Sequence, residues 1–225
     1  MNSKLQKQAD FLYLTLAALF IASLVVTNLI ANKFVTVDLG FKQFIISAGM
    51  IPYPFTFLIT DILSEIYGKQ KTTNVVITGF FASLFILLIL WLGSIFPAID
   101  QSPVSDEAYN MVFANSYRVV FSSMIAYLIA QFADLKLFHF WKRLTKGKHL
   151  WLRNNASTIV SQLLDTTLVI GVLFIGKMTF PEMGQLIKDG WMYKILFALA
   201  DTPLMYLAIF MIRKRFRLKE NEELT

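Results

Sequence analysis

The chain has 225 residues, of which 56% are hydrophobic and only 16% are charged. Soluble globular domains carry about 25% charged residues, so this composition favours an integral membrane protein. Cysteine is absent from the sequence, which excludes disulfides, thiolate nucleophiles and cysteine metal ligands. The length suits one domain, and no low-complexity linker divides residues 1–225.

A membrane-spanning helix needs roughly 20 mostly apolar residues. Six stretches have this length, and in chain order they are residues 11–31, 44–66, 75–96, 111–134, 154–176 and 190–212. The first is too long for a signal peptide and lacks a cleavage site, so we expect it to be retained. Pro52 and Pro54 interrupt the second, and a broken helix at membrane depth usually lines a cavity, with a plain kink as the alternative. The pattern predicts an all-α bundle of six transmembrane helices.

The positive charges lie mainly on one side of this predicted bundle. Of the 21 Lys and Arg residues, 15 fall in the N-terminus, the 67–74 turn, the 135–153 loop and the C-terminal tail, whereas the opposite loops hold 4. The positive-inside rule therefore places both termini in the cytoplasm. The basic segments 142–153 and 213–217 flank helix ends, which indicates contact with the anionic cytoplasmic leaflet rather than with nucleic acid.

Three charged residues lie in the middle of predicted helices. Asp165 and Asp201 are central in the fifth and sixth stretches, and Lys194 lies near the start of the sixth. A charge at the bilayer centre costs roughly 2.5–3.5 kcal/mol on insertion scales, so these side chains must face the bundle interior, pair, or line a wet cavity. Lys194 and Asp201 are separated by about 10 Å of helix, so each needs a partner from another helix, and Asp165 is a candidate for Lys194.

Polar residues recur on one face of the fifth stretch. Asn155, Thr158, Gln162 and Asp165 are spaced by three and four residues, which places them on one helical face. Such a stripe is typical of the wall of an aqueous path. Hydrogen bonding between helices is the alternative, and it accounts better for the hydroxyl side chains than for Gln162 and Asp165.

Asp61 and Glu65 share a face of the second stretch. Two carboxylates on one face repel unless a cation, a proton or a donor group lies between them. The alternative for Glu65 is a solvated position at the cytoplasmic interface, paired with Lys69.

In the fourth stretch, Gln131 and Asp134 lie beside Lys136, so an interfacial salt bridge is one interpretation of Asp134. Arg118 either extends outward to the interface or pairs with a carboxylate in the bundle.

The sequence lacks the phosphate-binding and catalytic motifs of common enzymes, including G-x-x-x-x-G-K-[ST], H-E-x-x-H and G-x-S-x-G. Its two histidines, His139 and His149, belong to the basic cytoplasmic segment, too far from the membrane centre for triad chemistry. We therefore expect no catalytic residue, cofactor or metal ion. An intramembrane hydrolase using Asp165 and Asp201 is a remaining alternative.

Five segments together resemble the queuosine precursor transporter family, also called the vitamin uptake transporter family. They are SLVVTNLIANK, PYPFTFLITDILSEIYG, YRVVFSSMIAYLIAQFADLKLFHFWKR, NNASTIVSQLLDT and YKILFALADTPLMY. The motifs TDxxxEIYG and R…AQxxD…F are specific to the family when they occur together. The sequence around Asp201 contributes less to the resemblance.

The resemblance implies a multi-pass protein of the bacterial inner membrane that imports a 7-deazaguanine base, such as 7-cyano- or 7-aminomethyl-7-deazaguanine, for salvage into tRNA modification. It also implies a fold similar to the substrate-binding subunits of energy-coupling-factor transporters. A vitamin-type substrate subunit that needs a separate ATPase module is the main alternative. Homo-oligomers are compatible with either role.

The buried polar residues suit such a purine-like ligand in chemical type. A carboxylate can accept hydrogen bonds from two adjacent N–H groups of the base, and an amide side chain can donate one to its carbonyl. An aromatic ring can stack on the face of the base. The expected substrate-binding residues are Tyr53, Asp61, Glu65, Gln131, Asn155, Gln162, Asp165 and Lys194. Structural or coupling roles are expected for Arg118, Asp134 and Asp201.

Overall fold

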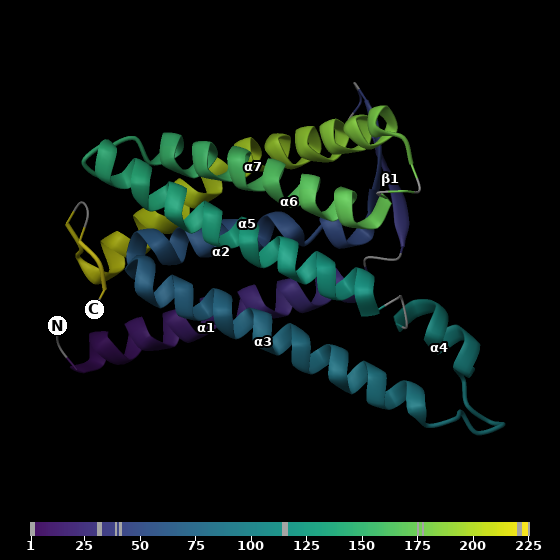
Figure 1. Ribbon diagram of the computed structural model, residues 1–225. Helices are drawn as coiled ribbons and strands as arrows, with labels where there is room; N and C mark the ends of the chain where they lie inside the picture. The colour runs from purple at the N-terminus through teal and green to yellow at the C-terminus, as the bar shows by residue number, and fades with distance from the viewer. Residues whose placement is uncertain are drawn as a thin grey trace.

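The computed structural model of the chain is a bundle of helices with one small β-hairpin (Figure 1). It describes residues 3–30, 33–38, 40, 42–113, 117–174, 176, 178–219 and 222–224, without the side chains of residues 34, 45, 117–123 and 173. The elements are α1 (Ser3–Leu29), β1 (Phe34–Asp38), β2 (Gln43–Ser47), a 3-10 turn (Ala48–Met50), α2 (Tyr53–Ile66), α3 (Gly68–Ile95), α4 (Asp106–Phe113), α5 (Tyr117–Leu144), α6 (Leu150–Phe174) and α7 (Phe180–Phe216).

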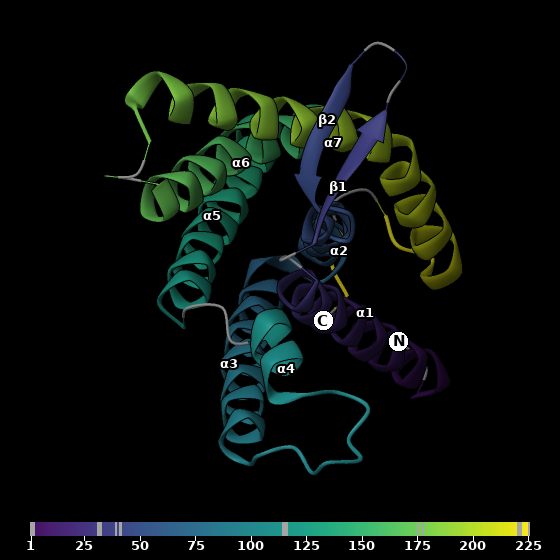
Figure 2. The same cartoon turned by 90° about the vertical axis from the view of Figure 1, so that its right-hand side faces the viewer.

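Helix α2 occupies the centre of the bundle (Figure 2). It contacts α1, α3, α5 and α7, and most of its residues are buried. Both chain termini lie at one end of the molecule, whereas the β-hairpin and α4 lie at the opposite end (Figure 1). The end with the termini also carries the α2–α3 turn and the α5–α6 turn, so it gathers most of the basic residues.

Three helices, α1, α3 and α7, are long and apolar enough to cross a membrane. Large apolar side chains on these helices point away from the bundle, including Phe11, Phe85 and Phe210, each at least 60% exposed. Lipid contact explains this exposure, because water would penalise so much apolar surface. The chain is therefore a helical membrane protein with several spans, and the total of six remains a prediction.

The second predicted stretch, residues 44–66, is not one helix. Residues 34–38 and 43–47 pair as an antiparallel hairpin, with Val35 opposite Ile46. The turn has Gly40 at a φ of 83°, and the backbone N–H of Gly40 donates to Asp38 at 2.8 Å. Alternating β-branched and aromatic residues favour strands here, and the prediction overlooked this pattern.

The two prolines of the second stretch start a helix instead of breaking one. α2 begins at Tyr53, directly after Pro52, and Pro54 occupies its first turn. Proline is well tolerated there, because the first N–H groups of a helix have no partner within it. α2 has only 14 residues, or about 21 Å of helix, which is shorter than the hydrocarbon layer.

Two more predicted boundaries are wrong. The fourth stretch, 111–134, is divided between α4, which ends at Phe113, and α5, which starts at Tyr117. The 135–153 segment is mostly helix, because α5 extends to Leu144 and α6 begins at Leu150. Four of its six basic residues, Lys136, Lys142, Arg143 and Arg153, therefore lie on helices, and Lys146 and Lys148 lie in the turn between them.

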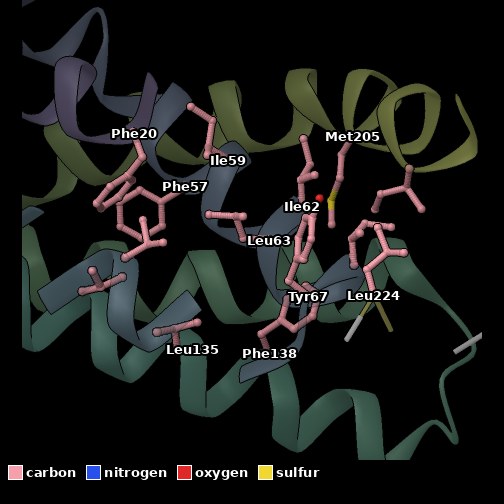
Figure 3. Close-up of a cluster of buried hydrophobic side chains, with 14 of the residues drawn as sticks. Phe20, Phe57, Ile59, Ile62, Leu63, Tyr67, Leu135, Phe138, Met205 and Leu224 are labelled. Carbon is pink, nitrogen blue, oxygen red and sulfur yellow. The ribbon is translucent and has the colours of Figure 1, made fainter. Parts of the chain in front are cut away.

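A hydrophobic cluster surrounds the second half of α2 (Figure 3). Leu63 and Ile66 of α2 are fully buried there, with Phe20 of α1, Phe138 of α5 and Met205 of α7 packed around them. Leu224 of the C-terminal tail joins the same cluster, and its N–H donates to the Ile66 carbonyl at 2.7 Å. The tail thus closes one end of the bundle.

Candidate functional site

A cavity of about 660 Å³ lies at the end of the bundle that carries the β-hairpin and α4. Its wall comes from α1, β2, the start of α2, and parts of α3, α5, α6 and α7. Small-molecule sites commonly enclose about 300–1,000 Å³ and are mostly apolar with a few polar groups. This cavity has that composition, because Leu, Ile, Val, Met and Phe side chains make up much of its lining.

An ion pair between α6 and α7 supplies the charge in this cavity. Lys194 Nζ donates to Asp165 Oδ2 at 2.6 Å, and both side chains are at most 10% exposed. The same ammonium lies 4.4 Å from the centre of the Tyr53 ring. The predicted candidate pair is thus formed, and the first turn of α2 adds an aromatic face to it.

Four buried hydroxyl groups in the cavity wall make no well-formed hydrogen bond with the described residues. They belong to Tyr53, Ser83, Tyr127 and Thr166. The Tyr53 hydroxyl lies near the Asp165 carboxylate and the Gln162 amide. Buried polar groups are normally paired, so unpaired hydroxyls around one cavity are suited to a polar ligand.

The rim of the cavity links the β-hairpin to α7. Lys42 Nζ donates to Asp189 at 2.6 Å, and this pair is about one-third exposed. Deeper in, the ring of Phe44 packs on Tyr193 with 5.5 Å between centroids. The hairpin is therefore fixed over one wall of the cavity by one ion pair and one aromatic contact.

Glu65 lies at the other end of α2, outside this cavity, in a buried ionic cluster. Its carboxylate pairs with Arg153 at 2.7 Å, Arg213 at 2.8 Å and Lys142 at 3.5 Å. Glu65 is 3% exposed, so the predicted solvated pair with Lys69 is wrong. Arg153 and Arg213 were assigned to the lipid surface because of their basic neighbours, but they serve an internal carboxylate.

Asp61 and Asp134 meet between the cavity and the ionic cluster. Their carboxyl groups lie near each other, and both are buried. Ser161 donates a further hydrogen bond to Asp134 at 2.9 Å. The predicted interfacial salt bridge of Asp134 is not formed, because Asp134 points into the bundle and not toward water.

The remaining predicted residues lie around these groups. Gln131 donates to Thr60 at 3.1 Å, and Asn155 donates to Thr202 at 2.9 Å, so both connect helices. Gln162 is buried beside the cavity with an unpaired amide oxygen. Asp201 lies on α7 within electrostatic reach of Asp61, and the Arg118 side chain falls outside the described part of the chain.

Among the cavity residues that the sequence reasoning missed are three with buried hydroxyl groups: Ser83, Tyr127 and Thr166. Tyr127 lies four residues before Gln131 and seven before Asp134, so it belongs to the same helical face as two predicted residues. Thr166 directly follows Asp165. The periodicity could have identified Tyr127, whereas Ser83 lies in an otherwise apolar helix with no such signal.

No three His, Asp or Glu side chains among the described residues are arranged to hold a metal ion. The lining of the cavity offers hydrogen-bonding groups, charged groups and aromatic rings.

Comparison with known proteins gives one family and several relatives. The family model described as "Putative vitamin uptake transporter" matches residues 47–208. The chain is 30% identical to a probable queuosine precursor transporter of Bacillus subtilis, over 73% of this chain and 72% of the relative. It is 25% identical to the queuosine precursor transporter of Escherichia coli, over 75% of this chain and 70% of the relative. No solved structure matches the chain.

Proposed function

The chain belongs to the family of putative vitamin uptake transporters, and on that premise we propose that it imports a queuosine precursor. The chain is a multi-pass membrane transporter and not an enzyme. The proposed substrate is a 7-deazaguanine base, such as 7-cyano- or 7-aminomethyl-7-deazaguanine, destined for tRNA modification. Two relatives are named as transporters of a queuosine precursor, which supports the broader assignment.

The Asp165–Lys194 pair in the cavity is the observation that carries the proposal. It presents a carboxylate acceptor directly beside an ammonium donor, 2.6 Å apart. The guanine-like edge of a deazaguanine presents two adjacent N–H donors beside a carbonyl acceptor. The carboxylate suits the N–H donors and the ammonium suits the carbonyl, so one pair of side chains complements the whole edge.

Aromatic and hydroxyl groups around this pair suit the rest of a flat heterocycle. Tyr53 and Tyr127 line the cavity, with their ring centroids 6.0 Å apart in an edge-to-face arrangement. An inserted base would gain stacking from such rings and hydrogen bonds from the unpaired hydroxyls. A vitamin without a donor–donor–acceptor edge would leave Asp165 or Lys194 without a partner in the ligand.

We further propose six membrane crossings, by α1, α2, α3, α5, α6 and α7, with both termini in the cytoplasm of a bacterial cell. The common end of the termini and its excess of basic residues support this orientation. The cavity then opens toward the outer side of the inner membrane. The Glu65 cluster and the C-terminal tail close the cytoplasmic side, as in an outward-facing state of a transporter.

Genetic complementation tests the proposed function. Cells that lack their own importer and precursor synthesis are given 7-cyano-7-deazaguanine, and queuosine in tRNA is measured. The wild-type gene should restore the modification, and Asp165→Asn should lose most of it at equal membrane expression. Glu107→Gln on the exposed helix α4 is the matched control and should act as wild type. If the wild-type gene did not restore queuosine in tRNA, the proposal would be wrong.

A vitamin-type substrate subunit that depends on an ATPase module is the second candidate, favoured by the description of the family as vitamin uptake transporters. An uptake assay with the purified chain in liposomes distinguishes the two candidates. Uptake of the precursor by the chain alone supports an independent importer, whereas uptake only with an added ATPase module supports the second candidate.

A further inference from the structure

Asp61 of α2 and Asp134 of α5 form a carboxyl pair that binding in the cavity does not use. They are 2% and 1% exposed, and neither lines the cavity. Their carboxyl groups lie near enough to interact with each other. Since an ionised carboxylate only accepts hydrogen bonds, a bond between them would require a proton on one of the two groups.

The groups around the pair supply no positive partner. Among the described residues, no Lys, Arg or His forms an ion pair with Asp61 or Asp134. From α6, Arg153 acts on Asp61 at longer range, but it contacts Glu65 at 2.7 Å. From α7, Asp201 adds a further negative charge. In the absence of a basic partner among the described residues, a proton is the cation that suits this site.

Three hydroxyl groups of α6 lie on the Asp134 side of the pair. Ser161 donates to Asp134 at 2.9 Å, and the hydroxyl groups of Ser157 and Thr158 lie nearby. Donors to one carboxylate favour its ionised form, which places the shared proton on Asp61. The pair is thus asymmetric, with one member prepared to carry a proton and the other to accept its hydrogen bond.

The pair is placed where a proton could affect both ends of α2. Asp61 lies eight residues after Tyr53 in the cavity wall and four before Glu65, or about 12 Å and 6 Å along the helix. Buried polar side chains link the cavity to this level: Tyr127 in the wall, then Thr56 and Thr60 of α2, and Gln131 of α5. Loss of the proton would leave two carboxylates repelling each other across the α2–α5 contact.

We propose that the Asp61–Asp134 pair is a proton-binding site that takes up and releases one proton in each transport cycle, coupling import to the proton gradient. This inference rests on the proposed function, because it requires that the chain moves a substrate. The pair carries the proton while the bundle is closed as observed. Its deprotonation separates α2 from α5 and weakens the contacts that close the cytoplasmic end.

Reconstituted transport provides the test, with 7-cyano-7-deazaguanine as the probe. With the outside one pH unit more acidic, a transporter moving one proton per neutral substrate should accumulate the probe about tenfold. A protonophore should abolish this accumulation. Asp61→Asn and Asp134→Asn should still exchange the probe across the membrane without a gradient, but should accumulate none. Asp106→Asn on α4 should behave as wild type.

The outcomes distinguish the proton-binding site from the proposed import function. If the wild type exchanges the probe but ignores the pH gradient, the proton site is refuted while the proposed function stands. If the wild type neither binds nor exchanges the probe, the proposed function fails first. Should both Asn variants fail to fold, proton movement recorded with a pH dye during wild-type exchange decides the question. Substrate flux without proton flux would overturn the proposal.

Discussion

The two ends of α2 have opposite surroundings. At its start, Tyr53 borders a cavity whose wall contains the buried Asp165–Lys194 pair, the Lys42–Asp189 pair at the rim, and several hydroxyl groups without a well-formed hydrogen bond. At its end, Glu65 contacts three cations, and the C-terminal tail closes over the helix through the hydrogen bond from Leu224 to Ile66. The first end has polar groups free for a ligand, whereas the second uses its charges to hold helices together.

This difference separates binding from stability within one short helix. Changes at the cavity end should alter affinity more than stability, and changes at the Glu65 end should do the reverse. A short ion pair therefore does not by itself indicate a binding site. The residues around it determine whether it contacts a ligand or stabilises the bundle. The following experiments test that division.

The largest expected effect is the loss of stability in Glu65→Gln. Arg153 is 1% exposed and would lose its carboxylate partner, and breaking a buried ion pair by removing one partner costs roughly 3–5 kcal/mol. Thermal unfolding of the purified protein in detergent measures this loss of stability. Glu223→Gln is the control, because Glu223 is 40% exposed and its pair with Lys142 contributes at most about 1 kcal/mol. Equal melting temperatures for both variants would contradict the role of the cluster.

Asp165→Asn should weaken binding of 7-cyano-7-deazaguanine. A hydrogen bond to a charged group is worth about 1.5–3 kcal/mol, so Kd should rise roughly ten- to a hundredfold. Equilibrium binding to the purified protein gives the value. Lys188→Gln serves as a control for the charge on α7, because Lys188 is exposed and does not line the cavity. An unchanged Kd in Asp165→Asn would remove this carboxylate from the site.

Smaller effects are expected for the unpaired hydroxyls. Ser83→Ala and Thr166→Val should leave the melting temperature of the free protein unchanged, because these groups make no well-formed hydrogen bond there. With ligand bound, each loss should cost about 0.5–1.5 kcal/mol, which is roughly a two- to tenfold rise in Kd. Thr78→Val on the exposed face of α3 is the control. If stability falls while Kd stays constant, the hydroxyls are structural.

The smallest effect concerns pH at the end with the termini. Burial, with Lys142, Lys69 and Arg143 nearby, lowers the pKa of His139 near the C-terminal end of α5 to about 4. The unfolded chain binds a proton at this histidine near pH 6.5, so the wild type should lose stability as pH falls from about 6.5 to about 4. His139→Gln should reduce that loss in thermal unfolding measured across the range. Identical pH slopes for variant and wild type would contradict the shift.

The sequence was informative about features that depend on the spacing of residues within a single helix. The spacing of Gln162 and Asp165 predicted a polar face on α6, of which Asp165 lines the cavity, and the cost of charge in lipid correctly suggested Lys194 as a partner for Asp165. These inferences depend on periodicity within single helices, which a sequence shows directly.

What the sequence could not show depends on contacts between distant segments. Glu65 lies 88 residues before Arg153 and 148 before Arg213, and no local pattern links them. Local pairing with Lys69 was the natural interpretation and was wrong. The hairpin was missed for another reason: its apolar residues adjoin those of α2, so the composition resembled a single membrane helix.

The most direct test of the central claim is a structure with 7-cyano-7-deazaguanine bound. The account predicts the base in the cavity of α2, α6 and α7, with its N–H edge on the Asp165 carboxylate and its carbonyl within hydrogen-bond distance of Lys194. A base bound beside Glu65, with Asp165 and Lys194 still paired only with each other, would contradict it.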